Sequence, residues 1–156
     1  MNRLCYVVAI NAVAIIAVLF TQLGTSVASS WRAPIVLDGA TSVTAEELVE
    51  LMKGLDNLVL IDNREQHQFQ QGTISGSYQL LYSQTSPDAL AKLAPSKQTP
   101  LVFYCDNIEC PHSIKAIRKA VSYGYLNIFW LRGGIAEWKQ KGLPLAAGNY
   151  DTTAIQ

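Results

Sequence analysis

Residues 101–122 read LVFYCDNIECPHSIKAIRKAVS. The first four form an uninterrupted apolar run, which is typical of a short strand buried on both faces. A helix is expected from about residue 111 to residue 122, and Gly124 then ends it. Cys105 lies at the junction, where the buried strand passes into a loop that leads to the helix.

Apolar strands alternate with helices along the rest of the chain. The other expected strands are residues 58–61, 77–82 and 127–131. Helices are expected after Thr44 and after Ser86, both of which can act as N-caps. This alternation predicts an α/β domain with a parallel sheet and helices on both faces. In such sheets ligands bind at the carboxyl ends of the strands, which is where Cys105 is expected to lie.

The composition describes an ordinary globular domain and excludes some partners. The chain has 156 residues, which fits a single domain with one sizeable core. Lys and Arg together number 12, as do Asp and Glu, so there is no basic field to attract nucleic acid. We therefore expect no nucleic-acid partner. The sequence implies no metal and no organic cofactor.

The N-terminal segment stands apart in composition. Residues 4–20 are apolar except for Asn11, and small residues that suit a signal-peptidase site follow them. We expect residues 1–28 to be a signal peptide or, if uncleaved, an N-terminal membrane anchor. The protein is then exported, periplasmic if the host is bacterial, and meets the membrane only through this segment. Residues 29–40 are expected to be an extended lead-in, and residues 146–156 a C-terminal tail.

Five segments of the chain, in the right order, resemble the rhodanese (sulfurtransferase) homology domain. They are residues 60–65 (LIDNRE), 72–77 (GTISGS), 102–105 (VFYC), 124–125 (GY) and 131–138 (LRGGIAEW). The resemblance covers residues 41–145. It implies a single rhodanese-like domain with a central, mostly parallel five-stranded sheet. It also implies that Cys105 is a catalytic cysteine that can carry sulfane sulfur as a persulfide.

The loop after Cys105 departs from the usual rhodanese loop. It is longer, because Ser113 follows the cysteine at a greater distance than the family's serine does. It carries Asp106 and Glu109, and no arginine, where thiosulfate-handling relatives often place a cation. Related phosphatases keep an arginine at the position of Pro111, so phosphatase activity is not expected. The residues assigned to this active-site loop are Asp106, Asn107, Ile108, Glu109, Pro111 and Ser113.

Sulfur transfer requires a thiolate at Cys105, because a thiol is a weak nucleophile. The following helix N-terminus and the N–H groups of the loop are expected to stabilise that thiolate and leave it open to solvent. The leading hypothesis is a sulfurtransferase that takes sulfur from a small donor, such as thiosulfate or a polysulfide, and passes it to a thiol acceptor, small or protein. The alternatives are a thiol–disulfide redox protein that uses Cys105 and Cys110, and a binding module of rhodanese fold without catalytic activity.

Cys110 and His112 are the auxiliary candidates. Cys110 can resolve a persulfide or sulfenate at Cys105, form a structural disulfide with it, or take no part. His112 can act as an acid, a base or a thiolate partner, or be an exposed histidine at the start of a helix. A metal site made of these three residues is not expected, because their spacing matches no structural zinc motif.

Asp62 and Arg64 follow the expected strand of residues 58–61. An Asp–Arg pair at such a position fastens neighbouring loops through bidentate hydrogen bonds. We expect this pair to be structural and to border the pocket at Cys105.

Overall fold

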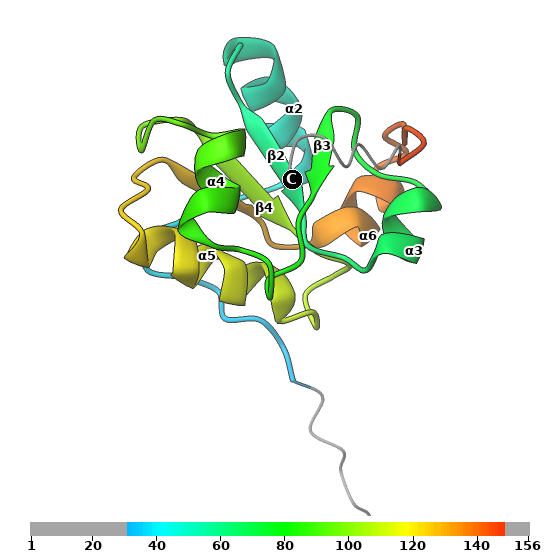
Figure 1. Cartoon of the computed structure of the whole chain (residues 1–156). Coiled ribbons are helices and arrows are strands. Elements are labelled where there is room, and N and C mark those ends of the chain that lie inside the picture. Colours follow the sequence, from blue (N-terminus) through cyan, green and yellow to red (C-terminus); the bar gives the residue numbers. More distant parts are fainter. Residues whose placement is uncertain (1–30, 149–156) are drawn as a thin grey trace, which may run out of the picture. The chain divides into compact units, whose positions relative to one another are not determined.

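The computed structural model describes residues 31–148. The signal peptide or anchor expected over residues 1–28 lies outside the described residues, as do the last eight residues of the expected tail. The strands are β1 (Thr41–Val43), β2 (Val59–Asp62), β3 (Ser77–Gln79), β4 (Leu101–Tyr104) and β5 (Ile128–Leu131). The helices are α2 (Ala45–Gly54), α3 (Gln66–Gln70), α4 (Pro87–Leu93), α5 (His112–Ser122) and α6 (Gly134–Gln140). Strands and helices alternate along the chain, as predicted (Figure 1).

The five strands form one sheet in the order β1-β5-β4-β2-β3, and every neighbouring pair is parallel. The predicted α/β domain with a five-stranded sheet is confirmed, and the sheet is wholly rather than mostly parallel. β4 is the central strand, where Leu101 lies opposite Val59 on one side and Ile128 on the other. The sequence pattern does not indicate β1, because three residues are too few to show a periodicity. This edge strand is fixed by its pairing with β5, far along the chain.

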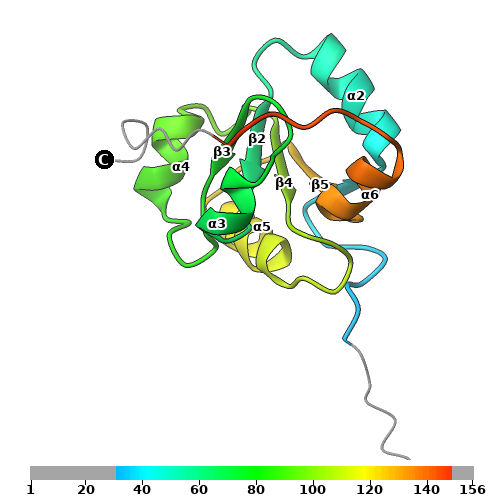
Figure 2. The same cartoon turned by 90° about the vertical axis from the view of Figure 1, so that its right-hand side faces the viewer.

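Helices cover both faces of the sheet. α4 and α5 bury Leu90 and Ile117 against one face, and α2 and α6 bury Leu48 and Ile135 against the other (Figure 2). Neighbouring residues of a strand point to opposite faces. β4 is therefore apolar throughout, since it must fill both halves of the core, and all four of its residues are fully buried.

Local sequence is sufficient to start two of the helices. The Thr44 hydroxyl accepts a hydrogen bond from the Glu47 backbone N–H at 3.2 Å, and the Glu47 carboxylate accepts one from the Thr44 N–H at 2.8 Å. The Ser86 hydroxyl caps α4 by accepting from the Ala89 N–H at 3.2 Å. Each cap stabilises its helix by about 1 kcal/mol. Both helix starts expected from the sequence are confirmed.

The last described residues pack onto the domain. Ala146 and Thr73 form an isolated antiparallel bridge, with backbone hydrogen bonds of 2.9 and 3.0 Å. The Trp138 indole N–H donates to the carbonyl of Pro144 at 2.9 Å. The packed chain therefore continues past Leu145, where the sequence predicts the domain to end. Within residues 31–148, no helix combines the length and apolar character that crossing a membrane requires.

Candidate active site

The candidate site lies at the carboxyl edge of the sheet. Because the strands are all parallel, the segments that follow them meet at this edge. β4 ends at Tyr104 and is followed by Cys105, whereas β2 is followed by Asn63. The Asn63 backbone N–H donates to the Tyr104 carbonyl at 2.9 Å. Asn63 and Cys105 are therefore neighbours across two adjacent strand ends.

Cys105 and Cys110 are joined by a disulfide, and their Cα atoms are 6.2 Å apart. This separation is ordinary for a disulfide. In this form Cys110 is bonded to Cys105, and its role in the chemistry stays a prediction. The bond leaves both the structural and the resolving role open, because either one uses this pairing.

Cys105 is buried in the disulfide form. It is 2% exposed, whereas Cys110 is half-buried. The expectation of an ionised Cys105 sulfur open to solvent is therefore wrong for this form, since a disulfide sulfur carries no charge. Cys105 can act as a nucleophile only after the bond has been reduced to two thiols.

The loop closes around Asn107. The Glu109 N–H donates to the side-chain oxygen of Asn107 at 2.8 Å, and the Cys110 N–H donates to its carbonyl at 3.1 Å. The amide of Asn107 donates in turn to the Asp106 carboxylate at 3.3 Å. Asn favours turns of this kind because its side chain can replace a backbone acceptor. Two N–H groups expected to cradle a thiolate are thus already used within the loop.

The first turn of α6 holds the head of the loop in place. The Ile135 N–H donates to the Cys105 carbonyl at 3.0 Å, and the Ala136 N–H donates to the Asp106 carbonyl at 2.9 Å. Gly134 permits this approach, because it has a φ of +63° and no side chain. The backbone at Cys105 is therefore fixed by an element outside its own loop.

The lead-in segment holds the middle of the loop. The Ala33 N–H donates to the Ile108 carbonyl at 2.6 Å. The Arg132 guanidinium donates to the carbonyls of Ala33 at 2.9 Å and Pro34 at 2.7 Å. The lead-in is thus part of the framework of the site and not merely an approach to the domain.

His112 lies beside the disulfide. One of its ring nitrogens and the sulfurs of Cys105 and Cys110 all lie within 4.8 Å of one another. The His112 ring stacks on Tyr82, with centroids 4.9 Å apart and planes inclined by 26°. The Lys115 ammonium lies 4.8 Å from the centroid of the same Tyr82 ring. His112 is half-buried rather than exposed, and the stacking holds its imidazole near both sulfurs.

α5 begins directly after the loop and has no side-chain cap among the described residues. Pro111 occupies the N-cap position, and its carbonyl accepts from the Lys115 N–H at 3.1 Å. The positive end of the helix dipole therefore lies next to Cys110 and His112. Ser113 has a different role, because its buried hydroxyl accepts from the Trp130 indole N–H at 3.2 Å and ties α5 to β5.

Asp62 and Arg64 form a buried bidentate ion pair, with Nη2 to Oδ2 at 2.6 Å and Nε to Oδ1 at 3.0 Å. Arg64 also donates to the Gly72 carbonyl at 2.7 Å, and the Thr73 hydroxyl donates to Asp62 at 2.9 Å. These contacts tie the segment after β2 to the one before β3. Burial, followed by the charge of Asp62, raises the pKa of the Tyr104 hydroxyl well above its usual range. That hydroxyl lies 2.7 Å from the Thr73 hydroxyl.

Asn63 contributes a buried acceptor that the sequence pattern does not indicate. Its side-chain amide donates to the Leu80 carbonyl at 2.7 Å, but its Oδ1 has no hydrogen-bond partner within residues 31–148. Such unpaired buried atoms are uncommon. Asn63 and Tyr82 could have been found from the sequence, because Asn63 comes soon after one expected strand and Tyr82 is the last residue of another, so both belong to the carboxyl edge.

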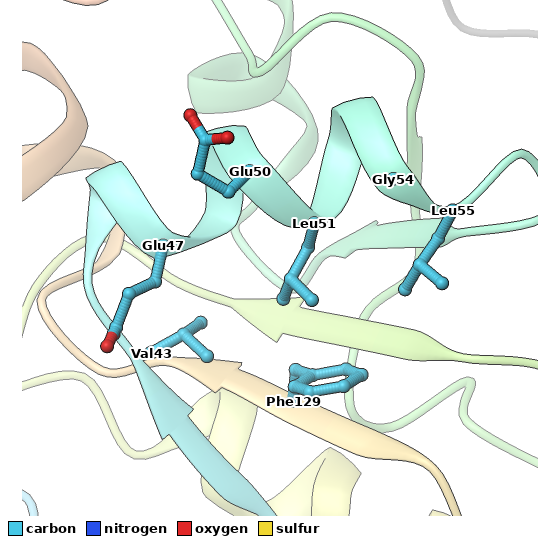
Figure 3. Close-up of a pocket in the computed structure, with 7 residues that line it drawn as sticks. All are labelled: Val43, Glu47, Glu50, Leu51, Gly54, Leu55 and Phe129. Carbon is cyan, nitrogen blue, oxygen red and sulfur yellow. The ribbon is translucent and has the colours of Figure 1, made fainter.

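A hollow of about 470 Å³ lies between α2 and the sheet, away from the Cys105 loop (Figure 3). Its lining residues are Val43, Glu47, Glu50, Leu51, Gly54, Leu55 and Phe129. Its two carboxylates already have partners, since Glu47 accepts from Thr44 and Glu50 pairs with Lys53 at 2.8 Å. No residue of the Cys105 loop lines it, so this hollow is separate from the candidate site.

Two kinds of sequence comparison agree with this architecture. The family model described as the rhodanese-like domain matches residues 44–141. The uncharacterized protein YibN of Escherichia coli K12 is 30% identical over 107 residues, which is 68% of this chain and 72% of that protein. The uncharacterized protein slr1261 of Synechocystis sp. is 34% identical over 105 residues, or 67% of this chain and 56% of that protein.

Solved structures give the same result for the fold. A thiosulfate sulfurtransferase from Pseudomonas aeruginosa superposes with a TM-score of 0.62 at 25% identity, covering 71% of this chain and 21% of that chain. The BH2092 protein of Bacillus halodurans also superposes with a TM-score of 0.62, at 19% identity. That match covers 70% of this chain and 78% of BH2092. The chain thus spans about a fifth of the length of the sulfurtransferase that it resembles.

Proposed function

The chain belongs to the rhodanese-like domain family, and from that premise we propose that it is a sulfurtransferase. In this proposal Cys105 carries sulfane sulfur as a persulfide and passes it to a thiol or another nucleophilic acceptor. The supporting observation is the place of Cys105, which follows the central strand β4 and precedes α5, whose first turn has no side-chain cap within residues 31–148. The similarity to a thiosulfate sulfurtransferase supports the class of reaction.

The cycle starts with reduction of the disulfide. Two thiol equivalents of a reductant open the Cys105–Cys110 bond, which gives two protein thiols and one disulfide of the reductant. The Cys105 thiolate then attacks the outer sulfur of a donor such as a polysulfide or thiosulfate. The sulfur–sulfur bond of the donor breaks, and its remainder leaves with the electron pair, as sulfite in the case of thiosulfate. Cys105 is left as a persulfide.

The surroundings of Cys105 act on the thiolate in opposite directions. The dipole of α5 favours a negative charge at its N-terminal end, and the nearby His112 can pair with a thiolate. Asp106 and Glu109 oppose that charge through Coulomb repulsion. The same carboxylates disfavour a doubly charged donor more than a singly charged one. We therefore expect a small organic persulfide, which carries one negative charge, to be a better donor than thiosulfate, which carries two.

Cys110 gives the persulfide a second outcome besides transfer to an external thiol. Its thiol can attack the inner sulfur, Cys105 Sγ, which expels the outer sulfur as hydrosulfide and forms the disulfide. Atoms and charge balance, since a persulfide anion and a thiol give a disulfide and hydrosulfide. In this proposal the observed bond is the resolved end of the cycle.

The expected export of the chain belongs to the same proposal. Disulfides persist in oxidising compartments, so an exported protein would rest with this bond closed. Its partners would then be a small sulfur donor, a thiol acceptor and a thiol reductant, all outside the cytoplasmic membrane.

Intact-mass spectrometry of three proteins tests the proposal. Reduced wild type and Cys110→Ala are exposed to polysulfide and to thiosulfate, with Cys105→Ser as the control. We expect one added sulfur on Cys110→Ala, none on Cys105→Ser, and disulfide with released sulfide from wild type. If neither reduced wild type nor Cys110→Ala gains sulfur or releases sulfide with any donor, the proposal is wrong.

A thiol–disulfide redox protein is the second candidate, and the disulfide itself favours it. In this alternative the same two cysteines exchange electrons with a partner's thiols, and no sulfane sulfur is involved. The Cys110→Ala protein separates the two candidates, because it can carry a persulfide but cannot form the intramolecular bond. If Cys110→Ala no longer exchanges electrons with a partner's thiols and carries no persulfide on Cys105, the redox role is favoured.

A further inference from the structure

We propose that the reduced form of this protein binds one monovalent copper ion through Cys105, Cys110 and His112. The two sulfurs and one ring nitrogen lie within 4.8 Å of one another. This inference goes beyond sulfur transfer, because it uses the same cysteines for a different ligand and requires no sulfur donor.

The kinds of ligand select a soft ion. Thiolate sulfur prefers Cu(I), zinc and iron–sulfur clusters, and imidazole suits copper and zinc. Structural zinc is almost always held by four protein ligands, whereas the described residues offer three here. Monovalent copper accepts three such ligands in a plane. The number and softness of the donors therefore point to copper.

The charge of the loop favours a cation over an anion. In the sequence Asp106 and Glu109 both lie between the two cysteines. Residues 105–113 contain no lysine or arginine. Reduction adds two thiolates to these carboxylates once a metal displaces the thiol protons. A cation bound at the sulfurs would relieve the repulsion within this group.

The geometry needs little change to hold an ion. Metal–sulfur and metal–nitrogen bonds are about 2.3 and 2.0 Å long, so ligands around one ion lie roughly 4 Å apart. On reduction the two sulfurs must separate from bonding distance to that spacing. The stacking of His112 on Tyr82 orients the imidazole, and the Ile135 N–H holds the Cys105 backbone. The half-buried Cys110 is at the more accessible end of the bond.

The binding step balances with a thiol as reductant. Two reductant thiols convert the protein disulfide into two thiols and become a disulfide themselves. Cu(I) then replaces the protons of Cys105 and Cys110, which releases two protons, and neutral His112 supplies the third bond. The oxidised protein lacks both thiolates and should not bind the ion.

Anaerobic titration of the reduced full chain with Cu(I), in competition with a coloured Cu(I) chelator, tests the proposal. We expect wild type to bind one equivalent of Cu(I) per chain and Cys110→Ser to bind none. In His112→Ala the affinity for Cu(I) should fall by more than about tenfold, because the loss of a residue that merely contacts a metal ligand can already cost that much. His112→Cys should retain the affinity because it restores a soft ligand. His67→Ala, which alters the exposed histidine of α3, is the matched control.

X-ray absorption at the copper edge gives a second readout. Three-coordinate copper is expected in wild type and two-coordinate copper in His112→Ala. Failure of reduced wild type to bind one equivalent, equal affinity in His112→Ala, or equal binding by the oxidised protein would each overturn the proposal. None of these results bears on persulfide formation, which Cys110→Ala reports separately.

Discussion

The carbonyl oxygen of Cys105 lies against Gly134, so closely that a Cβ placed on Gly134 would be 2.5 Å from it. Gly134 also has a φ of +63°, a conformation that residues with a side chain rarely adopt. Gly134, the first residue of α6, and Cys105 are therefore packed directly against each other. The absence of a side chain at position 134 lets α6 support the head of the loop.

Gly134→Ala should destabilise the protein and displace the loop. A positive φ costs an alanine about 1 kcal/mol, and forced contact with backbone atoms adds ~1–3 kcal/mol. Gly142→Ala is a matched control, because Gly142 has a φ of +68° but open space around it. Urea denaturation measures both variants. Equal losses of stability in the two would show that the contact with Cys105 is unimportant.

Reduction of the disulfide should lower the free energy of unfolding by about 2 kcal/mol, because the closed loop is short and constrains the unfolded chain only moderately. The cysteines are five positions apart. Denaturation with and without a thiol reductant measures the difference. Cys110→Ala should be insensitive to the reductant. A reduced wild type as stable as the oxidised one would contradict the expectation.

Arg64→Met should cost about 3–5 kcal/mol, because it leaves the Asp62 carboxylate buried without its cation. Both side chains of this pair are almost completely buried, with exposures of 3% and 0%. Lys53→Met is the control, since it breaks an ion pair with Glu50 whose side chains are 66% and 72% exposed. That change should stay within about 1 kcal/mol. Thermal and urea unfolding of both variants provide the test, and similar losses would refute the contrast.

Stability should fall at alkaline pH partly because of Tyr104. Burial and Asp62 raise the pKa of Tyr104 in the folded protein. Below pH ~10, the ordinary tyrosine pKa, the Tyr104 hydroxyl therefore contributes fully to the free energy of unfolding. This contribution declines as the pH rises above that value, because only the unfolded chain then loses the proton. The slope should approach about 1.4 kcal/mol per pH unit.

Tyr104→Phe removes that slope, and unfolding curves across the alkaline range reveal it as a difference from wild type. The variant should also be less stable at neutral pH, since the Ser77 hydroxyl and the Ile74 N–H lose their partner. Tyr78→Phe changes an exposed ring and serves as the control. An unchanged alkaline slope in Tyr104→Phe would show that this hydroxyl is not the source.

Much of the fold follows from local sequence. The apolar runs at β2, β4 and β5 place apolar side chains on both faces of each strand. They therefore predict a parallel sheet whose two faces are both covered by helices. Thr44 and Ser86 start their helices through bonds to residues three positions away. The position of Cys105 after a buried strand likewise follows from chain order. These features depend on neighbours in the sequence, and the sequence was enough to predict them.

The state of the site depends on contacts between distant segments. Strand β1 exists because it pairs with β5, and the loop is held by Ala33 and by the first turn of α6. The burial of Cys105, its bond to Cys110 and the stacking of His112 on Tyr82 result from where those segments meet in space. Periodicity and spacing identify the residue types and their order. The distances among the sulfurs and the imidazole were decided only when the sheet and its helices had packed.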